Sequence, residues 1–296
     1  MTSKGWDLQI SWRDQIDDFR YGVSLTLSDN TVTIDKYPNP SKNLGATYYD
    51  GAKLGNIWGY TTVGIAKTKE EMDAHLAKAN QDALGRNWGQ GDIMYADLNG
   101  DGKVNEGTST ADDSGDLRVI GNSTPRYNFG LNLDAAWKGF DLKVFFQGTL
   151  KRDYAVNSGD AMFWGGNVNK WQATGFTEHL DYLRPDANDA LGQNLDSYYP
   201  RVAWDSGKNQ HKQTKYLQNA AYARLKNVTL GYTLPQHITE KWYVQNLRLF
   251  VSAENLFTIT SFSKLSDPEL IDAGGWGFGK TYPLSKTFSC GLSVTF

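Results

Sequence analysis

Apolar and polar residues alternate along residues 127–150, in the sequence YNFGLNLDAAWKGFDLKVFFQGTL. The apolar side chains share one parity on each side of Lys138-Gly139: Phe129, Leu131, Leu133, Ala135 and Trp137 before it, and Phe140, Leu142, Val144, Phe146 and Leu150 after it. Because successive strand side chains point to opposite faces, this pattern predicts a β-hairpin with one apolar and one polar face. Each arm has about 11 residues, the length with which a tilted strand crosses the hydrocarbon of a bilayer.

The same alternation recurs and predicts seven strands in total. We expect them at residues 5–12, 21 to about 35, 127–137, 140–150, 216–233, 247–260 and 288–296. A change of parity at Lys226-Asn227 predicts a β-bulge in the fifth strand. The links near residues 13–18, 138–139 and 234–244 are short, whereas three insertions, at residues 36–117, 156–215 and 261–283, are long.

The first long insertion contains the one helix that the sequence predicts, from residue 69 to about residue 84. Thr68 and Glu71 have the spacing of a capping box, in which a threonine hydroxyl and a glutamate carboxylate satisfy the first free N–H groups of a helix. Met72, Leu76, Ala79 and Ala83 give this helix only a weak apolar stripe.

The alternation of short and long links is typical of an outer-membrane barrel, which has short turns on one rim and long loops on the other. Trp12, Trp137, Trp242 and Tyr243 all lie at the expected short-turn rim, where a membrane barrel carries an aromatic girdle. A soluble sandwich has no reason to keep charge off one face of all its strands. The pattern therefore favours a transmembrane β-barrel.

Composition narrows the class of protein further. A formal net charge of −3 and a pI near 5.8 give no reason to expect nucleic acid as a partner. The single cysteine, Cys290, excludes an internal disulfide framework. A mean hydropathy of −0.54 and the lack of an apolar run near 18 residues exclude transmembrane helices but leave a barrel open, because its strands are half polar. The first ten residues, MTSKGWDLQI, lack the apolar core of a signal peptide, so if the protein lies outside the cytoplasm we expect its N-terminal part to be missing from this chain.

Several blocks of the sequence resemble a known family. The stretches AAYARLKNVTLGYTLP, LRLFVSAENLFTITSF and YPLSKTFSCGLSVTF resemble the C-terminal end of SusC/RagA-type TonB-dependent transporters. GWDLQISWRD, LGNIWGYTTVGI, GDIMYADLNGDGKVN and VIGNSTPRYNFGLNL are similar to earlier blocks of that family and follow in the family's order. The resemblance covers nearly the whole chain.

The resemblance implies an all-β fold, with seven antiparallel strands from the C-terminal part of a 22-stranded transmembrane β-barrel, long extracellular loops and one short loop helix. Residues 1–296 would be a partial receptor barrel without the plug domain and the signal peptide. The implied activity is import of oligosaccharides, or of peptides, across the outer membrane of Bacteroidetes-type bacteria. The implied partners are outer-membrane lipid, a SusD-like surface lipoprotein, and the TonB complex through the missing N-terminal region.

One loop has the spacing of a calcium site. Asp97, Asn99, Asp101, Gly102 and Asn105 match positions 1, 3, 5, 6 and 9 of a twelve-residue calcium loop, and Lys103 would offer its carbonyl at position 7. Position 12 is Thr108 in place of the bidentate carboxylate, and Asp116 is the nearest candidate beyond an insertion. The spacing predicts a weak Ca²⁺ site; the alternative is an Asx-rich turn that needs no metal.

The second long insertion is rich in aromatic residues, of which we expect Trp164, Trp171 and Trp204 to stack on sugar rings. The alternative is that these rings pack the loops against each other or against the lipoprotein. Four histidines, His75, His179, His211 and His237, show no metal-ligand spacing, and neither a GxSxG motif nor a phosphate loop is present, so we do not expect an enzyme.

A second function class stays open at this stage. A secreted, calcium-stabilised, β-rich carbohydrate-binding module would also combine alternating strands, a calcium loop and loop aromatics. The charge-free strand faces and the C-terminal Phe296 favour the transporter.

Overall fold

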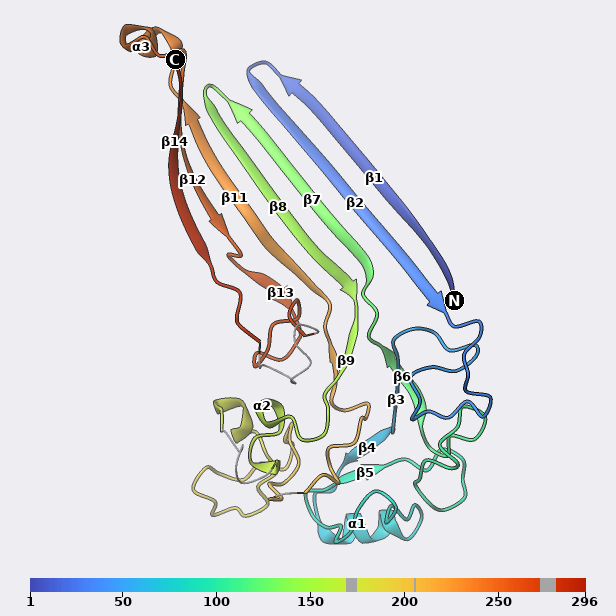
Figure 1. Cartoon of the computed structure of the whole chain (residues 1–296). Helices are drawn as coiled ribbons and strands as arrows, with labels where there is room; N and C mark the ends of the chain where they lie inside the picture. The colour runs from blue at the N-terminus through green and yellow to red at the C-terminus, as the bar shows by residue number, and fades with distance from the viewer. Residues whose placement is uncertain (169–174, 205, 272–280) are drawn as a thin grey trace.

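The computed structural model describes residues 1–168, 175–204, 206–271 and 281–296. Seven long antiparallel strands form one twisted, curved sheet, which we call the wall (Figure 1). In spatial order these strands are β1 (Thr2–Ile16), β2 (Phe19–Thr33), β7 (Arg126–Trp137), β8 (Phe140–Lys151), β11 (Tyr222–Thr233), β12 (Asn246–Glu254) and β14 (Thr287–Thr295). The prediction of an all-β fold built on seven antiparallel strands is confirmed.

A short eighth strand, β13 (Thr258–Thr260), continues the line of β12, because both pair with β11. Asn255, with a φ of 53°, separates the two. The predicted β-bulge is also present, since the pairing of β11 with β8 shifts register between Leu225 and Asn227. Lys226 is the additional residue at this point.

The pairing register aligns apolar side chains across all seven strands. One continuous row of directly paired residues runs Trp12, Val23, Leu133, Val144, Val228, Ala253 and Phe288. The neighbouring row runs Arg13, Gly22, Asp134, Lys143, Thr229, Ser252 and Ser289. Since side chains alternate between faces, the wall has an apolar face and a polar face, as the sequence predicts.

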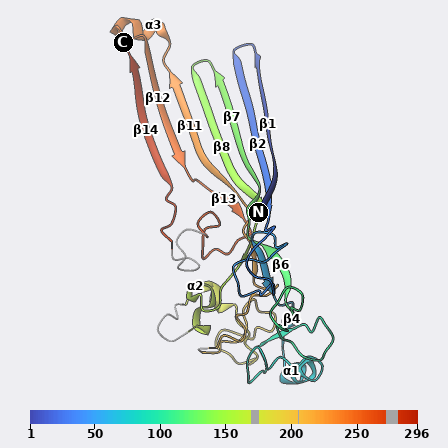
Figure 2. The same ribbon diagram turned by 45° about the vertical axis from the view of Figure 1, so that its right-hand side comes forward.

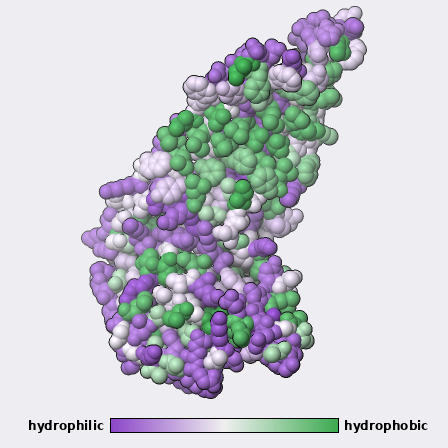
Figure 3. Space-filling model, turned by 180° about the vertical axis from the view of Figure 1, so that it is seen from behind, coloured by the Kyte–Doolittle hydropathy of each residue, from purple (hydrophilic) through white to green (hydrophobic). Residues whose placement is uncertain are grey.

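The apolar face is open to its surroundings. Ile10, Val251 and Phe288 expose 56%, 55% and 74% of their surface. In the view from behind, the strands carry a broad hydrophobic surface, whereas the opposite end of the molecule is mostly hydrophilic (Figure 3). Contiguous exposed apolar surface of this kind marks an interaction with another apolar partner or with a membrane.

One short link differs from its sequence-based boundaries. It was expected at residues 13–18, but β1 extends to Ile16 and only Asp17 and Asp18 form the turn. Antiparallel strands gain two hydrogen bonds at every second residue pair, and the positive φ of Asp17 makes the tight turn, so the polar segment before it stays in the sheet. The Lys138-Gly139 turn is as expected, with both residues at positive φ.

The third short link, between β11 and β12, contains two short helical segments. These are α3 (Gln236–Thr239) and the 3₁₀ turn η3 (Glu240–Trp242). Trp137, Trp242 and Tyr243 lie at this end of the wall and are all exposed. They occupy the rim for which the sequence predicts an aromatic girdle. Trp12, the fourth residue of that prediction, lies further along the wall, paired with Val23, because β1 continues to Ile16.

At the other end of the wall, the first two long insertions fold together (Figures 1 and 2). We call the described residues of 34–125 and 152–221 the cap. Its strands are β3 (Asn56–Gly59), β4 (Thr62–Ile65), β5 (Ile93–Tyr95), β6 (Arg118–Asn122), β9 (Asp153–Ala155) and β10 (Leu217–Asn219), and they pair as β3 with β6, β4 with β5, and β9 with β10. Its helical segments are α1 (Lys69–Leu76), α2 (Ala161–Trp164), η1 (Gly165–Asn167) and η2 (Thr177–Leu180).

The predicted loop helix is shorter than expected, and it is not the only one. Helix α1 begins as predicted, with the Thr68 hydroxyl accepting from the Glu71 N–H, but it ends at Leu76 and not near residue 84. The chain leaves the helix because the backbone of Asn80 pairs with that of Gly102 and Val104. The second half of the capping box also differs, since the Glu71 carboxylate accepts from the N–H of Lys67 and not of Thr68.

The cap has its own hydrophobic core. The buried residues of this core come from the first two insertions and, through Phe262, from the third: Tyr60, Ala79, Ile93, Tyr95, Val104, Val156, Ala161, Phe163, Trp164, Val168, Tyr199, Tyr216, Ala220 and Phe262. Aromatic rings dominate it, with Phe163, Tyr199 and Tyr216 in mutual edge or stacked contact. The long insertions therefore form a packed body and not separate loops.

The wall is an open sheet in the part of the chain that the structure describes: β1 and β14 are its two edges and do not pair with each other. None of the described helices is long and apolar enough to cross a bilayer.

Candidate functional site at the junction of wall and cap

The polar face of the wall carries an ion pair that spans three strands. Arg248 on β12 donates through Nε to Oδ1 of Asp141 on β8, at 2.8 Å, and through Nη2 to Oδ2 at 2.5 Å. The two side chains meet above Gly231 of β11, where a Cβ atom would overlap both of them. Arg248 thus has its charge partner on the wall itself.

A second network joins the third insertion to the wall. Arg224 of β11 is 3% exposed and donates to Thr258, Asp267 and Glu269. Lys226, the bulged residue, also donates to Glu269, at 2.8 Å. The described start of the third insertion is therefore held to the wall by two cations and two carboxylates.

Inside the cap, a buried carboxylate links the first two insertions. Asp92 is fully buried and accepts from Arg201, Lys208 and Asn209 at 2.7 to 3.0 Å. Burial raises the pKa of Asp92, but the hydrogen bonds from these three side chains outweigh burial and hold the pKa below its usual value. Asp92 is ionised at neutral pH and fixes the two insertions to each other.

The predicted calcium loop is closed by hydrogen bonds within the chain. Both carboxylate oxygens of Asp97 accept backbone N–H groups, from Gly100 and Gly102, and Asn99, Asp101 and Asn105 each accept one from a residue two positions later. This is the geometry of successive Asx turns. Among the described residues, no group of three or more His, Cys, Asp or Glu side chains is arranged to hold a metal ion. Calcium at this loop stays a prediction.

Asp116, the nearest candidate beyond the insertion, returns to this loop. It is fully buried, and its two oxygens accept from Leu98 at 2.7 Å and from Asn105 at 2.8 Å. Lys103 contributes a backbone pairing with Asn80. Asp116 therefore replaces the missing carboxylate at Thr108 as the residue that closes the loop.

Of the three tryptophans proposed for sugar stacking, the structure describes two, and these two differ in exposure. Trp164 is 2% exposed, lies in the aromatic core and donates its indole N–H to the Asn157 carbonyl, so in this structure it offers no face to a ligand. Trp204 is 57% exposed and remains a candidate. Trp171 lies outside the described residues.

Three of the four histidines make hydrogen bonds within the cap. His75 bonds to Gln81, His179 to the Phe163 carbonyl, and His211 to the Leu84 carbonyl. These contacts join turns of the cap to one another.

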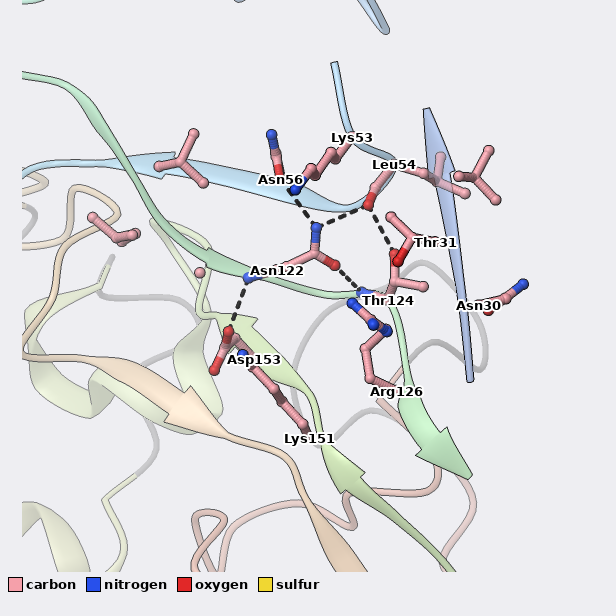
Figure 4. A pocket seen from close by; sticks show the side chains of 14 residues that line it. Asn30, Thr31, Lys53, Leu54, Asn56, Asn122, Thr124, Arg126, Lys151 and Asp153 are labelled. Atoms are coloured by element: carbon pink, nitrogen blue, oxygen red, sulfur yellow. Dashed lines mark hydrogen bonds between the residues drawn. The ribbon is translucent and has the colours of Figure 1, made fainter. Parts of the chain in front are cut away.

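A polar pocket of about 350 Å³ lies where the cap meets the wall. The sequence pattern did not single it out, because its residues come from four separate segments: Asn30, Thr31 and Val32; Lys53, Leu54 and Asn56; Val119, Ile120, Gly121, Asn122, Thr124 and Arg126; Lys151 and Asp153. Figure 4 shows these side chains around the opening, with β6 and the start of β7 crossing between β8 and the Lys53 segment.

Asn122 makes most of the hydrogen bonds that hold the lining of this pocket together. Its amide nitrogen donates to the Leu54 carbonyl and to Asn56, its amide oxygen accepts from the N–H of Thr124, and its own N–H donates to Asp153 (Figure 4). The Thr124 hydroxyl donates to the same Leu54 carbonyl. These bonds fix β6 to the start of β9 and to the Leu54–Asn56 segment, and they make the pocket a preformed feature of the junction.

Known proteins resemble this chain in sequence and in fold. The TonB-dependent receptors P3 and P26 of Formosa agariphila are 25% and 26% identical to it, over all of this chain and 29% of each receptor. The TonB-dependent receptor SusC of Bacteroides thetaiotaomicron is 26% identical over 69% of this chain and 17% of SusC. Among solved structures, that of the RagAB peptide transporter superposes with a TM-score of 0.66 at 21% identity, covering 99% of this chain and 29% of that one.

In sequence the chain is similar to TonB-dependent receptors, SusC among them, and it shares the fold of part of the RagAB structure. The resemblance noted in the sequence blocks is thereby confirmed. No protein-family model matches the chain. The chain spans about 29% of the length of the P3 and P26 receptors, which agrees with an open sheet in place of a closed barrel.

Proposed function

We propose that this receptor segment forms part of the barrel wall and outer cap of an outer-membrane importer. The observation that supports it best is the division of the wall into two faces. One row of seven paired apolar residues, from Trp12 to Phe288, crosses every wall strand, and the row beside it is polar. Lipid on one side and an aqueous path on the other account for both rows.

The membrane placement follows from the energetics of the apolar face. An Arg or Lys at the bilayer midplane costs about 2–4 kcal/mol on the lipid side of a barrel. The charged residues of the central wall, such as Asp134, Lys143 and Arg248, all lie on the polar face. Exposed Trp137, Trp242 and Tyr243 at the short-turn end suit the membrane interface, and the mainly hydrophilic cap suits the extracellular side.

We propose oligosaccharides or peptides as the imported substrates. The names of the similar proteins include SusC and a RagAB peptide transporter, and so leave both classes open. We further propose that a SusD-like lipoprotein covers the cap and that the receptor draws energy from the TonB complex through a region outside this chain. Exposed Trp204 is the remaining aromatic candidate for contact with a sugar or with the lipoprotein.

The alternative, a secreted carbohydrate-binding module, fits the fold less well. A module free in water would expose the whole apolar face together with the free edges of β1 and β14, and long exposed edges promote aggregation.

Uptake by whole cells tests the proposal. Cells that produce the receptor carrying these 296 residues should retain it in the outer-membrane fraction and import labelled oligosaccharide or peptide. A protonophore, which removes the energy source of TonB, should stop import without releasing the protein from the membrane. Recovery of the receptor in the soluble fraction, or uptake that continues unchanged when its gene is deleted, would contradict the proposal.

A further inference from the structure

The pocket at the junction of wall and cap carries two lysines without acidic partners. Lys53 and Lys151 both line it, from the segment before β3 and from the end of β8 (Figure 4). Neither ammonium group forms a salt bridge or a hydrogen bond with any residue in the described part of the chain. Each can therefore take a ligand group without first breaking an internal ion pair.

The other charged groups at this pocket are already engaged. Arg126 forms a bidentate ion pair with Asp29, which is nearly buried. Asp153 accepts the N–H of Asn122 with one carboxylate oxygen, at 2.9 Å. Because Asp29 neutralises Arg126, the remaining charged residues of the lining are two lysines and one carboxylate. The net charge of the lining is therefore positive.

The rest of the lining indicates how a ligand would be held. Amide and hydroxyl side chains prevail, namely Asn30, Thr31, Asn56, Asn122 and Thr124, and no aromatic ring lines the pocket. Recognition by ring stacking is thus excluded at this place, and hydrogen bonds and charge remain. The volume of about 350 Å³ is at the lower end of the range for small-molecule sites and suits one or two residues of a chain-like ligand.

We propose that this pocket binds a carboxylate-bearing unit of the imported ligand, with Lys53 and Lys151 as the two cations that recognise the carboxylate. The inference rests on the proposed import function and deepens it. Lys151 shares the parity of Lys143 and Gln147 on β8, so it extends the polar face of the wall into the pocket. A ligand released from the cap onto the wall would pass this position. A carboxylate could belong to a uronic acid or to a peptide, and the same two lysines would recognise either.

The test compares charge variants of the pocket in the whole receptor, purified in detergent. The variants are Lys53→Gln, Lys151→Gln and the double variant. The matched control is Lys143→Gln, which removes the same charge from the same strand but lies outside the pocket. The probes are tri-galacturonic acid and its neutral counterpart galactotriose, and a glutamate-containing tripeptide and an amidated alanine tripeptide. Calorimetry at 50 and 300 mM NaCl gives the affinities.

We expect an acidic probe to bind more tightly than its neutral counterpart and to weaken with salt. Each single variant should lose about three- to tenfold in affinity for that probe, the range of a charge-assisted contact at a partly solvated site, and the double variant should lose most of the salt dependence. Lys143→Gln should bind like the wild type. Preference for the acidic sugar, for the acidic peptide or for both supports the inference and identifies the source of the carboxylate.

Two results would overturn the inference. The first is that the acidic probes bind no more tightly than the neutral ones, which includes the case in which no probe binds. The second is that the double variant keeps wild-type affinity for the acidic probe. Import of a neutral oligosaccharide by a receptor that ignores acidic probes would reject the pocket assignment and leave the proposed function intact. Absence of any import would reject the proposed function, while the binding data would still report on the pocket.

Discussion

Gly231 has no side chain because two charged groups meet above it. A Cβ atom there would overlap the Arg248 guanidinium and the Asp141 carboxylate, which bond to each other across β11. The same reasoning does not apply to Gly64 in the cap, where a Cβ would meet only Met94 at an ordinary 3.7 Å. Gly231 thus makes room for an ion pair that ties two non-adjacent strands together.

We predict that Gly231→Ala lowers the stability of the assembled barrel by about 1–3 kcal/mol, because one of the two charged partners must move and lose its hydrogen bonds. The midpoint of thermal unfolding, followed by heat-modifiability on gels, measures this. Gly64→Ala is the control and should leave the midpoint near the wild-type value. Equal midpoints for the two variants would show that the ion pair does not depend on Gly231.

Asp116 offers a second test at the residue scale, because its two oxygens accept from different N–H groups. In Asp116→Asn the amide nitrogen must face either Leu98 or Asn105, and one buried donor loses its acceptor. We predict a loss of about 1–3 kcal/mol in local stability and faster protease cleavage of residues 97–108, with or without calcium. Unchanged cleavage would contradict the role of Asp116 in closing the loop.

Calcium itself is tested by removal. If Ca²⁺ binds as the spacing predicts, wild-type receptor should be cleaved more slowly within residues 97–108 in millimolar calcium than in EDTA, since a ligand that binds only the folded form stabilises it. Asp97→Ala should abolish this difference, and Asp112→Ala, outside the ligand set, should keep it. Identical digestion of the wild type in calcium and in EDTA would mark the loop as a metal-free turn.

The cap is the element whose stability depends most on a single buried charge. Asp92 holds Lys208 and Arg201 across the first two insertions, and Lys208 is only 7% exposed. Removal of one partner of a buried ion pair leaves an uncompensated charge, which costs about 3–5 kcal/mol. The cap should therefore loosen as a unit when this carboxylate is lost.

We predict that Asp92→Asn destabilises the cap by about 3 kcal/mol and raises hydrogen exchange at β5 and in the Arg201–Lys208 region together. The control is Asp73→Asn, which removes the partner of Lys69 in a solvent-exposed ion pair and should change little. Exchange that rises near Asp92 alone would show that the two insertions are held together by the aromatic core.

The pH dependence of the cap follows from the same group. The pKa of Asp92 is lower in the folded cap than in an unfolded chain, so its contribution to stability is present above the unfolded value of about 3.9. The contribution falls as the pH drops through the lower, folded value. Protection of the cap from hydrogen exchange should thus be constant between pH 5 and 7 and should decrease only below about pH 4, where Asp92 becomes protonated. In Asp92→Asn this decrease should be absent.

The two elements differ in how far the sequence predicts them. The wall repeats a period of two, and that period sets the strands, their faces and the bulge at Lys226. The cap depends on contacts between distant residues, such as Asp92 with Lys208, for which no local pattern exists. For the same reason, composition could not tell that Trp164 is in the core while Trp204 is exposed. The junction pocket, drawn from four segments, was equally beyond a local pattern.

On the scale of the whole molecule, the wall is a curved sheet with apolar side chains on one face and polar side chains on the other. The free edges of β1 and β14 are where further strands of a receptor barrel would pair. The cap closes one end of this sheet and joins it at the pocket around Asn122, while the Arg224 network holds the third insertion to the wall. Every functional proposal above depends on the apolar face meeting lipid.

Arginine substitution on the two faces of one hairpin tests that dependence most directly. In the whole receptor, Leu131→Arg and Val144→Arg place a charge on the apolar face, whereas Asn132→Arg and Gln147→Arg place the same charge on the polar face of the same two strands. Each arginine of the first pair costs about 2–4 kcal/mol at the bilayer midplane, so the amount of folded, heat-modifiable receptor in the outer membrane should fall strongly. For the second pair this amount should stay near that of the wild type. Equal tolerance of arginine on both faces would contradict the account.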